Sequence, residues 1–239
     1  GLPYVSWEFL TTEPDILMDT YGIKPMIINA IYTVVLTLLF CIPLGIGSAI
    51  YLAEYAKQGK IVSAIRFAIE ILAGIPSIVY GLFGMLFFVG YCKWDYSLLS
   101  GAMTLAIMVL PVIMRTTEEA LMAVPKSFRE GSFGLGAGKL RTVFVIVLPS
   151  AVPGILSGII LATGRIVGET AALIYTAGTM AKIPSNIFSS ARTLSVHMYR
   201  LSNEGLHTDA AFATAVVLLL MVIGINALSN VLAGKFAKK

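Results

Sequence analysis

The sequence predicts an all-α integral membrane protein with five transmembrane helices, and its composition and charge-free runs carry that prediction. The 239 residues are 57% hydrophobic and only 13% charged, against about 25% charged residues in soluble domains. Five runs of at least 19 residues contain no charge: Ile27–Ala53, Ile71–Cys92, Tyr96–Met114, Thr142–Gly164 and Ala210–Gly234. A helix crosses a bilayer with roughly 20 apolar residues, so each run can span it. Membrane strands would be shorter and would alternate polar and apolar residues.

Prolines and glycines divide and shape these runs in order along the chain. In the second run, the sequence Gly-Ile-Pro at 74–76 predicts a break between an entry helix, Ile61–Leu72, and the span proper, because proline cannot continue a helix without losing a hydrogen bond. In the fourth run, Gly154 and Gly158 allow close packing against another helix. Further prolines that permit kinks lie in or at the edge of the spans, at Pro43, Pro111, Pro149 and Pro153.

The placement of lysine and arginine predicts the orientation. If the first run enters from outside, the connections at 55–66 and 123–141 and the C-terminus are cytoplasmic, and together they hold ten of these residues against five on the other side. We therefore expect a cytoplasmic C-terminus, an external segment 1–25 and a transmembrane domain 26–239. Since an external segment that starts at Gly1 needs a way across the membrane, we expect a sixth, N-terminal helix to precede it.

Several classes of site are not predicted. Cys41 and Cys92 lie at different depths of their spans, so we expect two free thiols. His197 and His207 lie in the polar connection 177–209 and are expected to be solvated loop residues. No metal-ligand spacing, cofactor motif, protease motif or basic stripe for nucleic acid occurs. The hydrophobic content of that connection instead predicts short amphipathic helices that cap the external surface.

Charged residues inside the runs are the candidate functional residues, because ionisable groups at membrane depth usually face a cavity or a partner. Arg165 interrupts an apolar stretch, with Glu169 four residues later. Arg115 ends the third run, with Glu118 three residues later. An arginine binds tetrahedral oxyanions through its planar fork of donors, so the four residues predict an anion pathway. The alternative is that each arginine reaches the interface and forms a structural ion pair.

The stretch from Glu130 to Pro149 has four glycines ahead of a lysine, a composition typical of a phosphate-binding loop. The P-loop pattern nevertheless fails, because Phe133 stands at its first glycine and Leu140 at its hydroxyl position. The stretch matches another pattern: Glu and two small residues, three residues, Gly, nine residues, and Ile-x-Leu-Pro. The matching residues are Glu130, Gly131, Ser132, Gly136, Ile146, Leu148 and Pro149. This is the cytoplasmic signature of ABC importer permeases, which the chain resembles.

The resemblance implies that Glu130–Gly138 is a short coupling helix docked in a groove of a cytoplasmic ATPase. Small residues at 131 and 132 would let its backbone approach the groove, and Glu130 and the flanking Arg129 would make charged contacts there. The family has two alanines at positions 131 and 132, so the glycine lowers the helix propensity by up to about 1 kcal/mol.

Two further stretches, Gly74–Gly84 and Gly164–Gly178, closely resemble the A-type membrane subunit of phosphate-specific (Pst) ABC importers. This resemblance covers almost the whole chain and implies the type I importer permease fold. It also implies a role in phosphate passage for Arg115, Glu118 and Arg165. The implied setting is a bacterial or archaeal cytoplasmic (inner) membrane. The implied partners are membrane lipid, a homologous C-type permease, a cytoplasmic ABC ATPase dimer and an extracytoplasmic phosphate-binding protein.

Two other interpretations stay open. The chain could be an importer permease for another oxyanion or small solute, such as sulfate, molybdate or an amino acid. It could instead be an ATP-independent anion channel or secondary transporter, which would leave the coupling signature unexplained. In each case the chain has no catalytic constellation of its own and no cofactor is expected.

Overall fold

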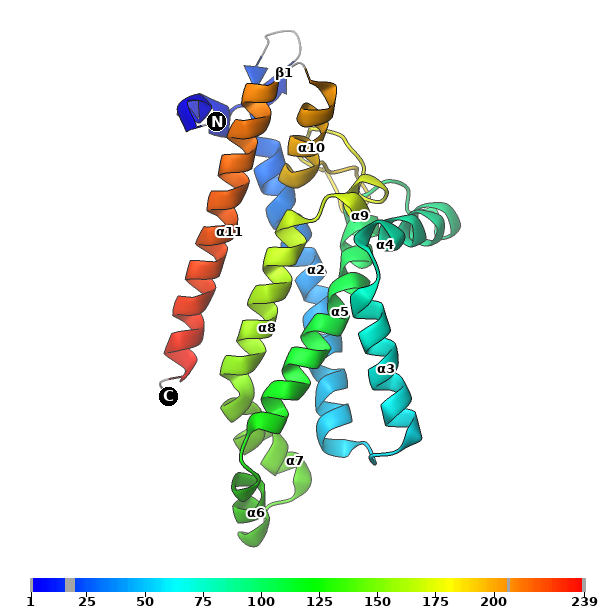
Figure 1. The fold of residues 1–239 in the computed structure, drawn as a ribbon, viewed down its shortest axis with the longest axis vertical. Coiled ribbons are helices and arrows are strands. Elements are labelled where there is room, and N and C mark those ends of the chain that lie inside the picture. Colours follow the sequence, from blue (N-terminus) through cyan, green and yellow to red (C-terminus); the bar gives the residue numbers. More distant parts are fainter. Residues whose placement is uncertain (1, 16–19, 206, 238–239) are drawn as a thin grey trace. The chain divides into compact units, whose positions relative to one another are not determined.

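The computed structural model describes residues 2–15, 20–205 and 207–237, and these residues are mostly helical (Figure 1). Four helical stretches are long and apolar enough to cross a membrane: Lys24–Tyr55, Leu98–Ala123, Lys139–Gly168 and Thr208–Ala227. A fifth candidate span consists of two parts, Lys60–Gly74 and Ser77–Tyr91, that are bent by 98°. The predicted all-α membrane fold is confirmed. The described part contains two short strands of two residues each, β1 (Pro14–Asp15) and β2 (Thr20–Tyr21), which pair antiparallel.

The bend in the fifth span follows from the sequence around Pro76. Helix α3 (Lys60–Gly74) ends at the glycine, and α4 (Ser77–Gly84) starts directly after Pro76, which has an extended backbone. A residue before proline avoids the helical region, so the chain turns at Ile75. The predicted break is confirmed, and it divides the charge-free run Ile71–Cys92 between helices. Its first residues belong to α3, and its end is the π-helix η3 (Met85–Tyr91).

The chain forms two compact units. The first unit contains residues 1–40, 75–108 and 163–225, and the second contains residues 41–74, 109–162 and 226–239. One boundary falls between α3 and α4, and the other four fall within long helices: α2 (Lys24–Ile50), α5 (Leu98–Ala123), α8 (Leu148–Gly168) and α11 (Thr208–Ala237).

The first unit joins its N-terminal elements to the segment between α8 and α11. These elements are η1 (Leu2–Tyr4), α1 (Trp7–Thr11), the β1–β2 pair, α9 (Ala171–Ile174) and α10 (Leu194–Glu204). Its core consists of Phe9, Ile23, Met26, Ala30, Leu194, Leu201, Ala210, Ala211 and Ala213. The buried Asn29 amide donates to the carbonyls of Lys182 and Arg192, both at 3.0 Å. Of the short amphipathic helices predicted for the connection 177–209, the described residues form one, α10, whereas residues 178–193 are irregular.

Helices α4 and α9 approach closely within the first unit (Figure 1). A Cβ at Gly81 would lie 2.8 Å from the backbone of Ala172, which is closer than any side chain allows. Glycine at this position is thus required by the contact between α4 and α9.

The second unit holds the remaining parts of α2, α5 and α8 together with a helical hairpin. The π-helix η2 (Tyr51–Tyr55) extends α2, and the hairpin consists of α6 (Lys126–Gly134) and α7 (Lys139–Thr142), which leads through the π-helix η4 (Val143–Val147) into α8. The core consists of Ile50, Leu121, Val124, Val143, Val147, Ala151 and Ile155. Gly154 and Gly158 face Ala120 and Thr116 of α5, so the predicted close packing of α8 is confirmed.

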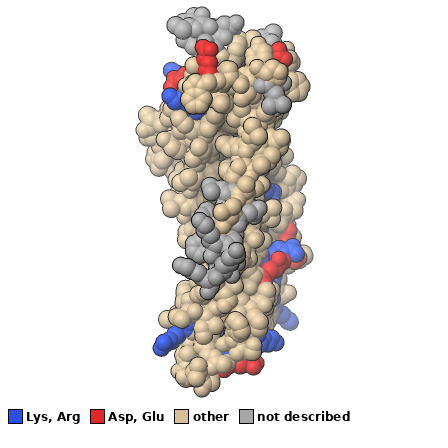
Figure 2. All heavy atoms as spheres, turned by 90° about the vertical axis from the view of Figure 1, so that its left-hand side faces the viewer, with Lys and Arg blue, Asp and Glu red and all other residues tan. Residues whose placement is uncertain are grey.

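Much of the described surface is apolar. Figure 2 shows a face on which most atoms belong to uncharged residues, with lysine, arginine and carboxylate side chains gathered at few places. The exposed residues include Leu219, Leu220 and Ile223 on α11. Soluble proteins rarely expose large contiguous apolar patches, so these helix faces suit contact with lipid or another membrane helix.

Candidate functional site

Arg115 lies on α5, and its carboxylate partner differs from the predicted one. Its Nε donates to Glu119 Oε1 at 2.9 Å, and the two side chains are 62% and 58% exposed. Around the axis of an α-helix, residue i+4 is turned by about 40° from residue i, and residue i+3 by about 60°. Glu119 therefore lies closer to the face of Arg115 than Glu118 does. Exposed pairs of this kind contribute little to stability, so Arg115 is held only weakly.

Glu118 pairs instead with Arg66 of α3. Arg66 Nη2 and Nε lie 2.6 and 2.9 Å from the same carboxylate oxygen, and the Glu118 side chain is only 11% exposed. The sequence-based prediction counted Arg66 within a cytoplasmic connection, but it lies in the middle of α3. The signal that could have identified it is the strongly amphipathic pattern of α3, with Glu70 one turn further on.

These side chains surround a hollow of about 220 Å³ on the second unit. It is lined by Arg66, Ile69, Glu70, Arg115, Glu118, Glu119 and Met122. Two arginines and three carboxylates give it a formal charge of about −1 if all are ionised. An anion that binds there competes with these carboxylates, and the exposed pair at Arg115 is the easier one to displace.

Arg165 lies in the last turn of α8, and Glu169 does not hold it. The helix ends at Gly168, so Glu169 leaves the helical face that the i+4 spacing predicted. Glu169 Oε1 instead accepts the backbone N–H of Ala172 at 3.1 Å at the start of α9, and its carbonyl accepts the hydroxyl of Ser195 at 2.6 Å. Among the described residues, the half-buried Arg165 side chain forms no ion pair with a carboxylate.

Arg165 and Arg115 belong to different units. Tyr80 of α4 lies close enough to Arg165 to interact with its charge. Arg165 is therefore a cation without an acidic partner at the end of an apolar helix, where the helix dipole also favours positive charge.

The segment expected to couple to another subunit is a helix followed by a tight turn. Helix α6 ends at Gly134, and Gly136 has a left-handed backbone with φ of +80°. The prediction of a helix over Glu130–Gly138 was thus wrong for its last four residues. The physical reason is that glycine in the left-handed region terminates helices. Glu130 and Gly131 lie exposed on α6.

Arg129 and Ser132 are directed into the protein. The Arg129 side chain pairs with Glu54 of η2 at 2.6 Å and is only 19% exposed. The hydroxyls of Ser132 and Thr142 lie 2.8 Å apart and are buried, which joins α6 to α7. The sequence analysis expected Arg129 to contact another subunit, but in the structure its side chain binds Glu54 of the same chain.

The end of the signature forms the start of α8. Ile146 lies in the π-helix η4, and Leu148 donates its N–H to the carbonyl of Val143, five residues back. Pro149 follows in the first turn of α8. Because the proline ring clashes with the carbonyl four residues before it in a regular helix, the wider π-helical turn before Pro149 makes room for the ring.

His197 differs from the prediction of a solvated loop residue, whereas His207 lies in the loop before α11 and is half-buried. His197 is buried in α10, and its Nδ1 lies 3.3 Å from Arg192 Nη1. Burial, together with the charges of Arg192 and Arg200, lowers the pKa of His197 to about 3. His207 Nε2 lies 2.9 Å from the hydroxyl of Tyr21. Both are packed parts of the first unit. Cys41 and Cys92 are free thiols, as predicted.

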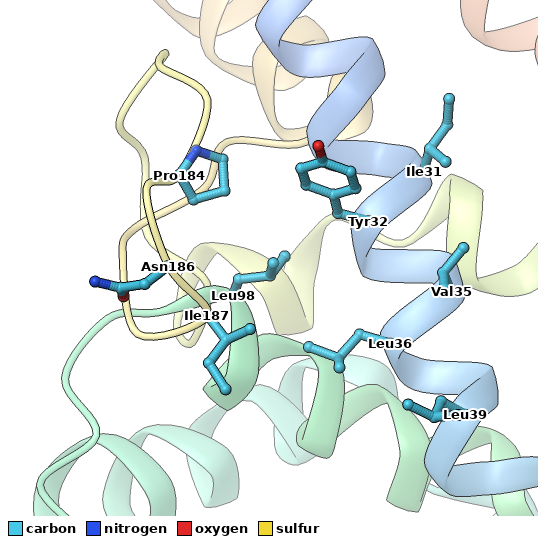
Figure 3. Close-up of a pocket in the computed structure, with 9 residues that line it drawn as sticks. All are labelled: Ile31, Tyr32, Val35, Leu36, Leu39, Leu98, Pro184, Asn186 and Ile187. Atoms are coloured by element: carbon cyan, nitrogen blue, oxygen red, sulfur yellow. The ribbon is translucent and has the colours of Figure 1, made fainter.

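A larger hollow on the first unit, about 440 Å³, is apolar. Figure 3 shows side chains of α2 facing Leu98 and the connection before α10; the lining residues are Ile31, Tyr32, Val35, Leu36, Leu39, Leu98, Pro184, Asn186 and Ile187. No charged group lines it, so it does not suit an anion.

Comparisons with known proteins agree with this arrangement. Residues 41–239 match the family described as binding-protein-dependent transport system inner membrane component. The chain is 38% identical to the probable ABC transporter permease protein YqgI of Bacillus subtilis, over 100% of this chain and 87% of that protein. It is 33% identical to the phosphate transport system permease protein PstA of Xylella fastidiosa, over 95% of this chain and 82% of that protein.

The fold is also similar to a solved structure. A chain in the inward facing MetNI methionine ABC transporter superposes with a TM-score of 0.70, at 18% identity, over 95% of this chain and 99% of that chain. At this level of identity the similarity concerns the fold.

Proposed function

The chain belongs to the family of binding-protein-dependent transport system inner membrane components and has the fold of a type I ABC importer permease, and we propose that it carries inorganic phosphate. In this proposal it forms half of the translocation pathway in a bacterial or archaeal cytoplasmic membrane. A homologous permease forms the other half, an ABC ATPase dimer binds on the cytoplasmic side, and a phosphate-binding protein docks outside.

The surroundings of Arg165 are the observation that supports an anionic cargo. A half-buried guanidinium without a carboxylate partner among the described residues, at the end of an apolar helix, has its charge unmatched by the protein around it. Arginine keeps its charge and offers a planar fork that fits a tetrahedral oxyanion. The 33% identity to a phosphate transport permease supports phosphate among the oxyanions.

Arg115 provides the second step of the pathway in this proposal. Its exposed pair with Glu119 is weak, so a phosphate can take the place of the carboxylate, and the carboxylate can then compete to release it. Weak and repeated binding of this kind favours passage over trapping. Glu118, in contrast, stays neutralised by Arg66 and shapes the hollow.

Helix α6 provides the contact with the ATPase in the proposal. Glu130 is exposed on α6, and Leu135, directly after the helix, is 91% exposed. Closure of the ATPase dimer on ATP would move α6 and change which side of the membrane the pathway faces. Hydrolysis belongs to the ATPase subunit, and the C-terminus of this chain lies in the cytoplasm.

Uptake of radiolabelled phosphate by cells that depend on this chain tests the proposal. Arg165→Gln is expected to lower uptake by about tenfold or more, since charged hydrogen bonds contribute about 1.5–3 kcal/mol. Arg165→Lys should restore only part, because a point charge does not reproduce the fork. The matched control is Arg200→Gln, at a partly exposed arginine in a loose 3.6 Å pair with Glu204, and it should transport normally.

Three results would contradict the proposal. Competition by sulfate or methionine, with none by unlabelled phosphate, would assign another cargo. Phosphate flux through the purified chain without ATP would favour a channel or secondary transporter. Normal uptake by Arg165→Gln would mean that this arginine is not part of the pathway.

A further inference from the structure

Arg129 makes more internal contacts than any other charged side chain of α6. Its Nε and Nη2 donate to Glu54 Oε1 at 3.2 and 2.6 Å. Its Nη1 donates to the carbonyl of Val124 at 2.8 Å, and Nη2 also donates to the carbonyl of Leu121 at 2.9 Å. The side chains of Arg129 and Glu54 are 19% and 10% exposed, so little of either is left for another subunit.

The two carbonyls lie at the end of α5: Leu121 is in its last turn, and Val124 directly follows the helix. That helix stops at Ala123, because Pro125 cannot continue it. The last carbonyls of a helix lack their usual i+4 partners. The Leu121 carbonyl accepts the N–H of Val124 at a long 3.3 Å, and Arg129 donates to this carbonyl and to that of Val124. The same guanidinium thus fastens α6 to α5 and, through Glu54, to the end of η2.

The side chains on α6 show which face of the helix is attached to the rest of the chain. Arg129 and Ser132 are three residues apart and lie on one face; the first contacts α5 and η2, and the second contacts Thr142 of α7. Phe128 and Phe133 are about half exposed. One face of α6 is therefore anchored within the chain while other side chains are free to meet a partner.

We propose that Arg129 and Glu54 form a latch that makes α6, the end of α5 and η2 move as one body when a partner displaces α6. Arg129 is then a positioning residue that passes the displacement to two membrane helices. This role rests on the proposed coupling of α6 to the ATPase. An arginine is needed because one planar group must reach a carboxylate and two carbonyls at once, which the single ammonium of lysine does not do.

The first test measures distance with the latch intact. The exposed Ser127 of α6 and Lys57 after η2 are replaced by cysteine and spin-labelled, in a background where Cys41 and Cys92 are alanine, and the distance is measured by electron paramagnetic resonance in the complex with its ATPase. The latch predicts one narrow distance, unchanged between the nucleotide-free and ATP-bound states. A distance that changes between the two states would overturn the proposal.

The second test measures transport per ATP hydrolysed in the same complex. Glu54→Gln and Arg129→Lys should keep the ATPase bound and hydrolysing, with a broadened label distance. The cargo moved per ATP should fall by about fivefold or more, as expected for the loss of a coupling free energy. Glu204→Gln removes a carboxylate from an exposed pair on α10 and is the control. Normal coupling and a narrow distance in both latch variants would overturn the proposal.

The outcomes separate this inference from the proposed function. If the wild-type complex moves no phosphate, the cargo assignment fails, yet the label distance still tests the latch. If phosphate uptake is normal but the distance between α6 and η2 changes on ATP binding, the latch fails alone.

Discussion

Replacing Gly154 with alanine tests how closely α8 approaches α5 in the second unit. The added Cβ would lie 2.6 Å from Ala120 Cβ, whereas carbon atoms pack at about 3.5–4.0 Å. The helices would have to separate by about 1 Å, and overpacking of this kind costs about 1–3 kcal/mol. Alanine in place of glycine gains about 1 kcal/mol in helix propensity. We therefore expect a net loss of about 0–2 kcal/mol of unfolding free energy.

The reciprocal change at Ala120 isolates the contact. In the double variant Gly154→Ala with Ala120→Gly, the methyl group moves from one helix to the other, and the nearest remaining atom is Ala120 Cα at 3.5 Å, an ordinary contact. The two propensity changes cancel, so the double variant should be about as stable as the original chain. The coupling energy in this cycle should be about 1–3 kcal/mol.

Unfolding of the purified chain by SDS in mixed micelles, followed by circular dichroism, measures these differences. Gly47→Ala on α2 is the control, because no atom lies within 4 Å of its added Cβ; it should keep or slightly raise stability. A coupling energy near zero, with Gly154→Ala as stable as Gly47→Ala, would refute the close approach of α8 to α5.

Two further predictions concern the turn after α6 and the buried histidine. Gly136→Phe should strain the left-handed turn by about 1–2 kcal/mol and weaken binding of the ATPase. Gly136→Asn should retain ATPase binding, because asparagine tolerates that backbone. Equal loss of ATPase binding in both variants would show that the residue contacts the partner directly. The pKa of His197 is lowered to about 3 by burial and by Arg192 and Arg200, so protons bind the unfolded chain more readily below about pH 6.5. The contribution of the neutral His197 to the unfolding free energy should therefore be fully present above that pH. It should fall by up to about 1.4 kcal/mol per pH unit as the pH drops towards 3. His197→Gln should flatten this slope between pH 4 and 6 in the same unfolding assay, and an unchanged slope would count against the buried neutral imidazole.

The features that the sequence predicted correctly depend on neighbouring residues. The long apolar runs mark the spans because their composition alone determines whether a helix can stay in lipid. The break at Ile75 follows from Gly74 and Pro76 in the same way. The end of α6 could also have been predicted, since a glycine two residues after the helix, at position 136, is a common stop signal.

The features that were missed depend on residues far apart in the chain. Glu118 pairs with Arg66, 52 positions away, and Arg129 pairs with Glu54, 75 positions away. Spacing along one helix favoured Arg115 as the partner of Glu118, and the family resemblance favoured a contact of Arg129 with another subunit; tertiary packing provided a different partner for each. The burial of His197 has the same origin, because it depends on how α10 packs within the first unit.

The π-helical turn at Val143–Val147 affects how related chains should be aligned. It holds one more residue than an α-helical turn, so a relative shorter by one residue here could still form an unbroken helix. Each residue of an α-helix accounts for about 100° of rotation. A deletion within the regular part of α8 would turn the hairpin of α6 and α7 by about that angle, whereas a deletion at the π-helical turn removes only its extra residue and leaves the hairpin near its present orientation. A one-residue gap at this point in an alignment would therefore identify relatives that have a regular α-helix here and still present the same face of the hairpin to their partner.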